Sequence, residues 1–126
     1  MSAGAEAIAE EMRAAQRAHR GALSMDALEQ WFAENLEVRH DPPRDMDGFM
    51  SSEERRAMRE AYSANPARQR LTRTPVGDFE VVGDTIVCGI VYDGPEPGDY
   101  RAVRFVYTVE GNEIVKLEDS DMPRSS

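Results

Sequence analysis

The sequence predicts an α+β fold, in which three N-terminal helices pack on a curved antiparallel β-sheet. This prediction follows from a change of period in the apolar residues. They recur every three or four positions through most of residues 5–64, as on one face of a helix, and alternate with polar residues after Arg68, as in half-buried strands. The length of 126 residues suits one domain, which we expect to span residues 1–126.

The first two helices are predicted over residues 5–20 and 24–34. One stripe with helical spacing defines the first: Ala5, Ile8, Met12, Ala15 and His19. Gly21 can adopt the left-handed backbone that ends a helix, and Ser24 can cap the next one. The second helix is expected to bury Met25, Leu28, Trp31 and Phe32.

The third helix is predicted over residues 52–64. It begins at the capping box Ser51-x-x-Glu54 and ends at Asn65-Pro66. Its expected inward face consists of Ala57, Met58, Ala61 and Tyr62. A loop rich in Pro, Asp and Gly over residues 41–48 precedes it.

Five strands are predicted: residues 36–40, 70–82, 85–92, 100–109 and 113–120. The first of these delivers His40 and Asp41 to the stop formed by Pro42 and Pro43. Pro75 and Gly77 interrupt the second strand and predict a bulge or bend there, because Pro cannot donate to the ladder. Curvature of the sheet follows from such a bend.

Tight turns set the expected register of the sheet. The turn Gly83-Asp84 pairs Val81 with Ile86 and Phe79 with Cys88. For the last hairpin we favour a three-residue loop, 110–112, over a two-residue turn, because it aligns apolar side chains. The resulting pairs are Tyr107 with Val115, Phe105 with Leu117, Val103 with Asp119, and Arg101 with Asp121. Two carboxylates thus reach the inner, apolar side of the sheet.

Charge and composition narrow the classes of partner. The net charge is −9, and no run of Lys or Arg occurs, which argues against nucleic acid and anionic membranes. The N-terminus lacks the features of a secretory signal, and no stretch is apolar for about 20 residues, the length of a membrane span. A single cysteine, Cys88, allows no intrachain disulfide. We therefore expect a cytoplasmic protein.

The order of the elements, the segment F-A-E-N-L-E-V-R-H-D-P and the final G-x-x-I-V-x-L resemble the nuclear transport factor 2-like superfamily, in particular its SnoaL-like branch. The resemblance covers residues 5–121. It implies a cone, in which helices cover a bent sheet and leave an apolar pocket at one end. Members include polyketide cyclases, ketosteroid isomerases, dehydratases, epoxide hydrolases and non-catalytic binding or dimerisation domains.

The resemblance also implies candidate catalytic residues. The base at the end of the first strand corresponds to His40 or Asp41, depending on the alignment. The acid/base Asp of the cyclase-like branch corresponds to Asp119 or Asp121. The oxyanion pair of the isomerase-like branch has no match, because the corresponding positions hold Gln16 or His19 and Arg104. An Asp-Arg-Asp arrangement, as in the epoxide hydrolases, would require Arg101 between the two last-strand carboxylates.

Aromatic and charged side chains are the candidates for binding a substrate: Trp31, Tyr62, Tyr92, Arg101 and Tyr107. The four aromatic residues also fit the ordinary interpretation as core. Cys88 is expected to be buried and inert, and His19 to be packed. Because His19 and His40 lack the spacing of metal ligands, no metal site or cofactor is predicted.

Three functions remain open from the sequence. The first is a cofactor-independent acid/base enzyme of cyclase, isomerase or dehydratase type, acting on a small apolar oxygenated molecule such as a polyketide. The second is a non-catalytic ligand-binding or dimerisation module, and the third is an epoxide hydrolase. The outer face of the sheet is expected to be apolar and to form a homodimer through Val82, Val87, Val91, Ala102 and Val106.

Overall fold

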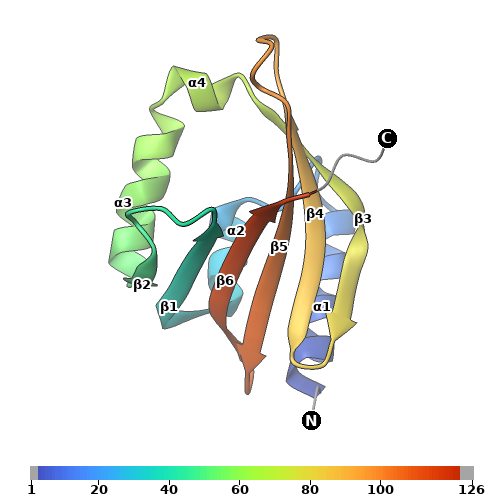
Figure 1. Ribbon diagram of the computed structural model, residues 1–126. Coiled ribbons are helices and arrows are strands. Elements are labelled where there is room, and N and C mark those ends of the chain that lie inside the picture. Colours follow the sequence, from blue (N-terminus) through green and yellow to red (C-terminus); the bar gives the residue numbers. More distant parts are fainter. Residues whose placement is uncertain (1–2, 123–126) are drawn as a thin grey trace.

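A computed structural model describes residues 3–122 and contains one six-stranded sheet, with one helix against the sheet and another standing apart from it (Figure 1). The helices are α1 (Ala3–Arg17), α2 (Met25–Leu28), the 3-10 helix η1 (Glu29–Trp31), α3 (Ser52–Ser63) and α4 (Pro66–Gln69). The strands are β1 (Phe32–Asp41), β2 (Gly48–Met50), β3 (Thr72–Val82), β4 (Thr85–Asp93), β5 (Arg101–Glu110) and β6 (Glu113–Asp121). The predicted α+β fold is confirmed. No helix within residues 3–122 has the length and apolarity needed to cross a membrane.

The strands are ordered β2-β1-β6-β5-β4-β3. All neighbours are antiparallel except β1 and β6, which run parallel, so the expectation of a wholly antiparallel sheet is wrong at this one pairing. The parallel pairing arises because the chain leaves β1, forms α3 and the β3–β5 meander, and returns alongside β1 only at its end. This topology brings the end of the first strand against the end of the last.

The second helix is shorter than predicted. It ends at Leu28, one turn of 3-10 helix follows, and the strand begins at Phe32 rather than at residue 36. The apolar run Trp31-Phe32-Ala33 fits either period, and the pairing of Phe32 with Ile114 of β6 decides for the strand. The caps at Ser24 and Ser51 are confirmed by hydrogen bonds to Ala27 and Glu54.

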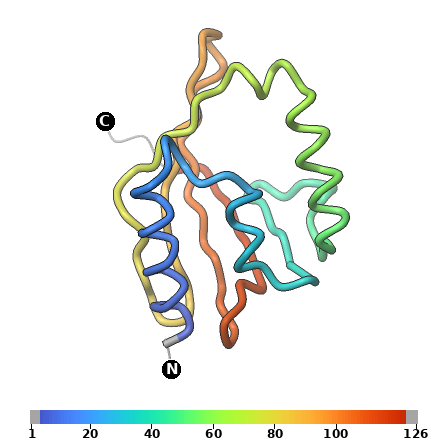
Figure 2. The backbone as a smooth tube through the Cα atoms, turned by 180° about the vertical axis from the view of Figure 1, so that it is seen from behind, coloured from blue at the N-terminus to red at the C-terminus, as the bar shows by residue number. Residues whose placement is uncertain are grey.

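Helix α1 covers the back of β3, β4 and β5 (Figure 2). Its buried face consists of Ala5, Ile8, Ala9 and Met12, which join Ile86, Tyr107 and Ile114 of the sheet in the main core. The helix ends at Arg17, three residues earlier than expected, and His19 lies exposed in the following turn. The prediction that His19 is packed is therefore wrong.

The predicted register is correct at the turn between β3 and β4. Between β5 and β6 the observed pairing differs from the predicted one by two residues. Val81 pairs with Ile86 as expected, and the predicted irregularity of β3 lies between Val76 and Glu80, which leaves Phe79 without Cys88 as its partner. The last hairpin has a two-residue turn and then a bulge at Val115. The pairs become Tyr107 with Leu117, Phe105 with Asp119, and Val103 with Asp121. A shift of two residues keeps Leu117, Asp119 and Asp121 on their predicted face. Before the bulge it is Ile114, and not the predicted Val115, that enters the core.

Helix α3 stands away from the sheet, which contradicts the expected packing of Ala57 and Ala61, since both are exposed (Figure 1). Its one buried side chain is Arg55, 1% exposed. The Arg55 guanidinium binds the Glu29 carboxylate at 2.5 and 3.1 Å. It also donates to three main-chain oxygens, those of Ala33, Glu34 and Met50. Arg55 thus attaches α3 to η1, β1 and β2.

We predict that Arg55→Met destabilises the protein by about 3–5 kcal/mol, because the substitution leaves the Glu29 charge and three carbonyl groups without their main partner. The free energy of unfolding in urea measures this cost. Arg56→Met, on the exposed side of the same helix, is the matched control and changes stability by less than about 0.5 kcal/mol. Equal effects of the two substitutions would contradict this role of Arg55.

Candidate functional site

A cavity of about 560 Å³ lies between α3 and α4 on one side and the inner face of the sheet on the other. Its volume is in the range of pockets for small organic molecules. Sheet residues provide one apolar wall: Val38, Ile90, Val103, Phe105 and Leu117. Four methionines from separate elements also line the cavity: Met25 of α2, Met46 before β2, Met50 of β2 and Met58 of α3. Methionine side chains adapt to ligands of different shape, so the cavity is suited to an apolar body.

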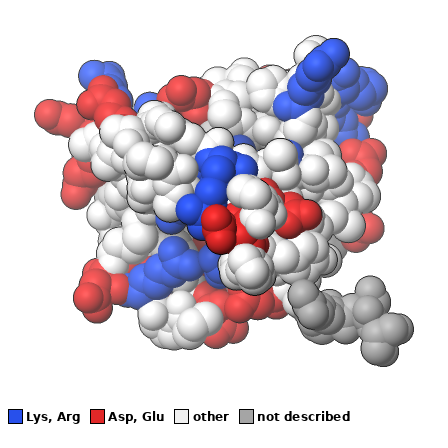
Figure 3. All heavy atoms as spheres, turned by 90° about the horizontal axis from the view of Figure 1, so that it is seen from above, with Lys and Arg blue, Asp and Glu red and all other residues white. Residues whose placement is uncertain are grey.

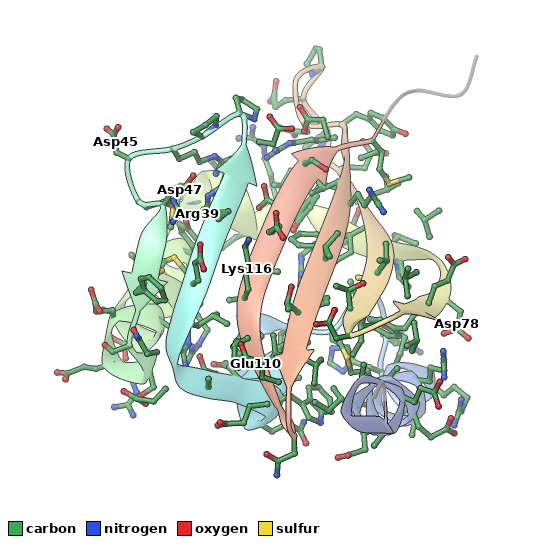
Figure 4. The ribbon with its side chains drawn as sticks, turned by 60° about the horizontal axis from the view of Figure 1, so that its bottom comes forward. Arg39, Asp45, Asp47, Asp78, Glu110 and Lys116 are labelled. Carbon is green, nitrogen blue, oxygen red and sulfur yellow. The ribbon has the colours of Figure 1, made fainter. Side chains whose placement is uncertain are left out.

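His40 faces this cavity, and Asp41 does not. Successive residues of a strand point to opposite faces, so His40 shares the inward face of β1 with Val38. Arg39 and Asp41 point to the other face, and Asp41 is exposed. Figure 4 shows Arg39 on the outer surface of the sheet. The sequence left open whether His40 or Asp41 points inward. The alternation of side chains along β1 shows that it is His40.

Asp47 orients the imidazole of His40. It lies in the loop that returns from β1 to β2, beside β1 in Figure 4. Its Oδ1 is 2.5 Å from His40 Nδ1, and its Oδ2 accepts from the main-chain N–H groups of His40 and Arg44 at 3.2 and 3.3 Å. The hydrogen bond to His40 is the main reason that the pKa of Asp47 is lowered. An ionised Asp47 places a proton on Nδ1 and leaves Nε2 facing the opposite way.

Asp119 lies on that opposite side of the ring. The parallel register pairs His40 with Asp119, and His40 Nε2 is 3.3 Å from Asp119 Oδ2. The second oxygen of this carboxyl, Oδ1, is buried and has no hydrogen-bond partner among the described residues. Burial raises the pKa of Asp119, although the positive charges nearby oppose the shift. Asp47, His40 and Asp119 therefore form a linear group at the cavity wall, with carboxyl groups of opposite proton affinity at its ends.

Asp47 was missed in the sequence. The loop Asp41–Gly48 is recognisable by composition, but composition does not reveal which of its carboxylates turns back onto β1. The only local signal is the spacing of three residues between Arg44 and Asp47, which permits the main-chain hydrogen bond that closes the loop.

Asp121 and Arg101 form a separate, more exposed pair. Arg101 Nε is 2.8 Å from Asp121 Oδ1, with side chains 40% and 59% exposed. Arg101 lines the cavity, whereas Asp121 does not. Within residues 3–122 Arg101 forms no ion pair with Asp119, so the Asp-Arg-Asp arrangement of an epoxide hydrolase is not assembled.

The aromatic candidates separate into core and cavity. Trp31 is 5% exposed, lies in the main core and donates to Glu11 at 3.3 Å, so its predicted place in the cavity wall is wrong. Tyr62, Tyr92 and Tyr107 line the cavity as expected. Burial raises the pKa of Tyr107 well above its usual value, which keeps its phenol protonated. Burial also raises the pKa of Cys88 to about 11, so this thiol is a poor nucleophile at neutral pH.

Six arginines line the cavity, a feature that the acidic composition conceals: Arg44, Arg55, Arg59, Arg68, Arg73 and Arg101. They are dispersed along the sequence and meet only in the fold. Figure 3, a view onto the upper end of the molecule, shows basic side chains gathered near the centre, beside acidic ones. The expectation of a mostly apolar pocket is therefore incomplete. No cluster of His, Cys, Asp and Glu that could hold a metal ion occurs in the described part of the chain.

No family model and no curated protein matches the sequence. Several solved structures are similar in fold, among them the following three. A protein of unknown function with a cystatin-like fold from Xanthomonas campestris has a TM-score of 0.61 at 11% identity, over 95% of this chain and 88% of that one. A proposed SnoaL-like polyketide cyclase from Mesorhizobium loti has a TM-score of 0.57 at 17% identity, over 92% and 94%. An NTF2-like protein from Anabaena variabilis has a TM-score of 0.56 at 14% identity, over 96% and 85%.

We predict that Asp119→Asn raises the melting temperature relative to wild type, and by more at pH 8 than at pH 4. The folded-state pKa of Asp119 lies above its unfolded value, so its contribution to stability is present at low pH and is lost as the pH rises through the folded pKa. Asparagine does not ionise and avoids this loss. Asp121→Asn, at the exposed end of the same strand, is the control for the substitution itself and should not raise the melting temperature. If Asp119→Asn raised the melting temperature more at pH 4 than at pH 8, the result would contradict a raised pKa of Asp119.

Proposed function

We propose that this chain, which has the nuclear transport factor 2-like fold, is a cofactor-independent acid/base enzyme of cyclase, isomerase or dehydratase type. Its substrate would be a small oxygenated molecule with a largely apolar body, such as a polyketide. The observation that carries this proposal is the group Asp47–His40–Asp119 on the wall of a cavity of about 560 Å³. Similar fold alone does not indicate chemistry, so the proposal depends on these side chains.

In the proposed reaction His40 is the general base. Asp47 holds the ring by Nδ1, which leaves Nε2, the nitrogen beside Asp119, as the atom that takes a proton from a carbon or hydroxyl group of the substrate. Asp119, whose pKa is raised by burial, is suited to return a proton to the product. Protons are only redistributed within the substrate, so no further reactant is needed for an isomerisation.

Charge that develops on a substrate oxygen requires a stabilising group. Arg101 and Tyr92 occupy paired positions on β5 and β4 and both line the cavity. Tyr62 lines it from α3, with the Arg68 guanidinium 4.1 Å from its ring centre. A phenol or guanidinium that donates to the oxygen lowers the barrier to proton transfer at the adjacent carbon. These groups are our candidates for that role, in place of the oxyanion pair absent from the sequence.

The proposal predicts that the protein accelerates exchange of α-protons of an aryl ketone with solvent. In D₂O, we expect the protein to make deuterium incorporation into the methyl group of 2-acetylnaphthalene faster than in buffer alone. Proton NMR measures this incorporation. His40→Asn and Asp119→Asn should each lower the catalysed rate by roughly 100-fold or more. The exposed residues His19 and Asp41 supply matched controls, His19→Gln and Asp41→Asn, which should retain the rate.

A ligand that binds without exchange would favour the non-catalytic binding module instead. The decisive combination is a clear thermal shift with the ketone, no acceleration of exchange over solvent, and no difference between wild type and His40→Asn. That result would contradict the enzyme proposal for this class of substrate and leave the cavity as a binding site.

We also propose a homodimer through the outer face of the sheet. Val82 is 60% exposed there, and Val87, Val91, Ala102 and Val106 are half-buried beside it. The expected result is a dimer in light scattering at tens of micromolar, with Val87→Arg giving a monomer. A wild-type monomer at this concentration would contradict the proposal.

A further inference from the structure

The arginines of the cavity differ in whether their charge is already neutralised. Arg55 and Arg59 bind Glu29, and Arg59 also binds Asp26 at 2.5 Å. Arg101 binds Asp121. The guanidinium groups of Arg44, Arg68 and Arg73 form no ion pair with a carboxylate among residues 3–122, although all three residues line the cavity. Three positive charges therefore remain available at its wall.

The acidic residues of the same cavity do not balance these three charges. Asp99 is bound by Arg70 at 2.6 and 2.9 Å, and Asp26 is bound by Arg59. Asp119 shares its environment with His40, and its burial favours the neutral acid. The cavity thus carries an excess of positive charge in a protein whose net charge is −9. An interior of this sign attracts an anion and repels the many cations that bind an acidic surface.

Arg73 is the best placed of the three to bind an anion. It is half-buried on the inner face of β3, opposite Tyr92, with its guanidinium 5.6 Å from the centre of that ring. Arg101 is the residue on the other side of Tyr92 in the sheet. Stacking on Tyr92 restrains the Arg73 guanidinium without using its N–H donors, so the fork remains free for a carboxylate.

The register also sets the distance between this anion site and the proton-transfer group. Phe105 is opposite Asp119, which is opposite His40, whereas Arg101 is four residues away from Phe105 along β5. At a rise of about 3.3 Å per residue, Arg101 is about 13 Å along the strands from the level of Asp119 and His40. Arg73 also lies on β3, four strands from β1, which at about 4.8 Å per strand is about 19 Å across the sheet. Both side chains line the same cavity, so the extended Arg73 and His40 side chains and an elongated ligand of two fused rings, with a substituent at each end, together span this separation.

We propose that the substrate of this site is an apolar carboxylic acid, with its carboxylate on Arg73 and its reacting carbon at His40. The inference rests on the proposed function, because it assigns a substrate class to the same cavity. Arg44 and Arg68 add long-range attraction, and Tyr92 offers its ring to the body of the ligand. The carboxylate fixes the direction in which the molecule enters.

The test compares 6-acetyl-2-naphthoate with its primary amide, which differ in charge and hardly in shape, by isothermal titration. Wild type should bind the acid at least tenfold more tightly than the amide at low salt. Arg73→Gln should remove this preference and leave amide binding unchanged, while Arg73→Lys should retain part of it. Arg68→Gln provides a second variant in a different element. Arg104→Gln, exposed on the outer face of β5, is the matched control and should bind as wild type.

Equal binding of the acid and the amide, or an acid preference that survives both Arg73→Gln and Arg68→Gln, would overturn the inference. Failure of both compounds to bind at millimolar concentration would also overturn it. Deuterium exchange, measured with the same two compounds, tests the proposed acid/base reaction separately from the proposed substrate class. Exchange that depends on His40 without an acid preference overturns the substrate class alone. An acid preference that depends on Arg73, without exchange, supports the substrate class and overturns the reaction.

Discussion

The buried Arg55 is the interaction on which the cavity depends. A helix that packed directly on the sheet would fill the space between them, but α3 is attached mainly by the Arg55 guanidinium, which meets Glu29 and three main-chain oxygens, with Arg59 adding ion pairs to Glu29 and Asp26. A buried charge is tolerated only where its hydrogen bonds are complete, and such a group keeps a defined position. The helix is therefore held by charged contacts at Arg55 and Arg59, while its Met58 and Tyr62 border an open volume instead of a core.

The chemistry of the candidate site follows from one parallel strand pairing. Because β1 and β6 run in the same direction, His40 and Asp119 lie at the same level near their ends, and the return of the chain to β2 adds Asp47 behind the ring. The two carboxyl groups then have opposite surroundings: hydrogen bonds lower the pKa of Asp47, and burial raises that of Asp119. Such a separation allows one group to orient the imidazole and the other to exchange a proton with it.

Local patterns in the sequence predicted most helices and strands and which side chains of each strand point inward. They could not predict which residues distant in the sequence become neighbours. Alternation identified Phe105, Tyr107 and Asp119 as inward residues, and this survived an error of two residues in register because faces depend only on parity. The run at Trp31 and Phe32 was misassigned because it fits both periods, and pairing with β6 decides it. Asp47 and Arg73 could not be found, since a loop carboxylate and dispersed arginines acquire their neighbours only when distant segments meet. The resemblance to the nuclear transport factor 2-like fold is confirmed, while the roles of the site residues remain predictions.

The central claim is that Asp47 holds His40 by Nδ1 and so presents Nε2 for proton transfer in the cavity. The tautomer of neutral His40 tests it most directly, by imidazole ¹⁵N NMR at a pH above the imidazole titration, with His19→Gln used to assign the two histidines. The account predicts a protonated Nδ1 and an unprotonated Nε2 for His40, and loss of this preference in Asp47→Asn. An Nε2-protonated ring in the wild-type protein, unchanged by Asp47→Asn, would contradict it.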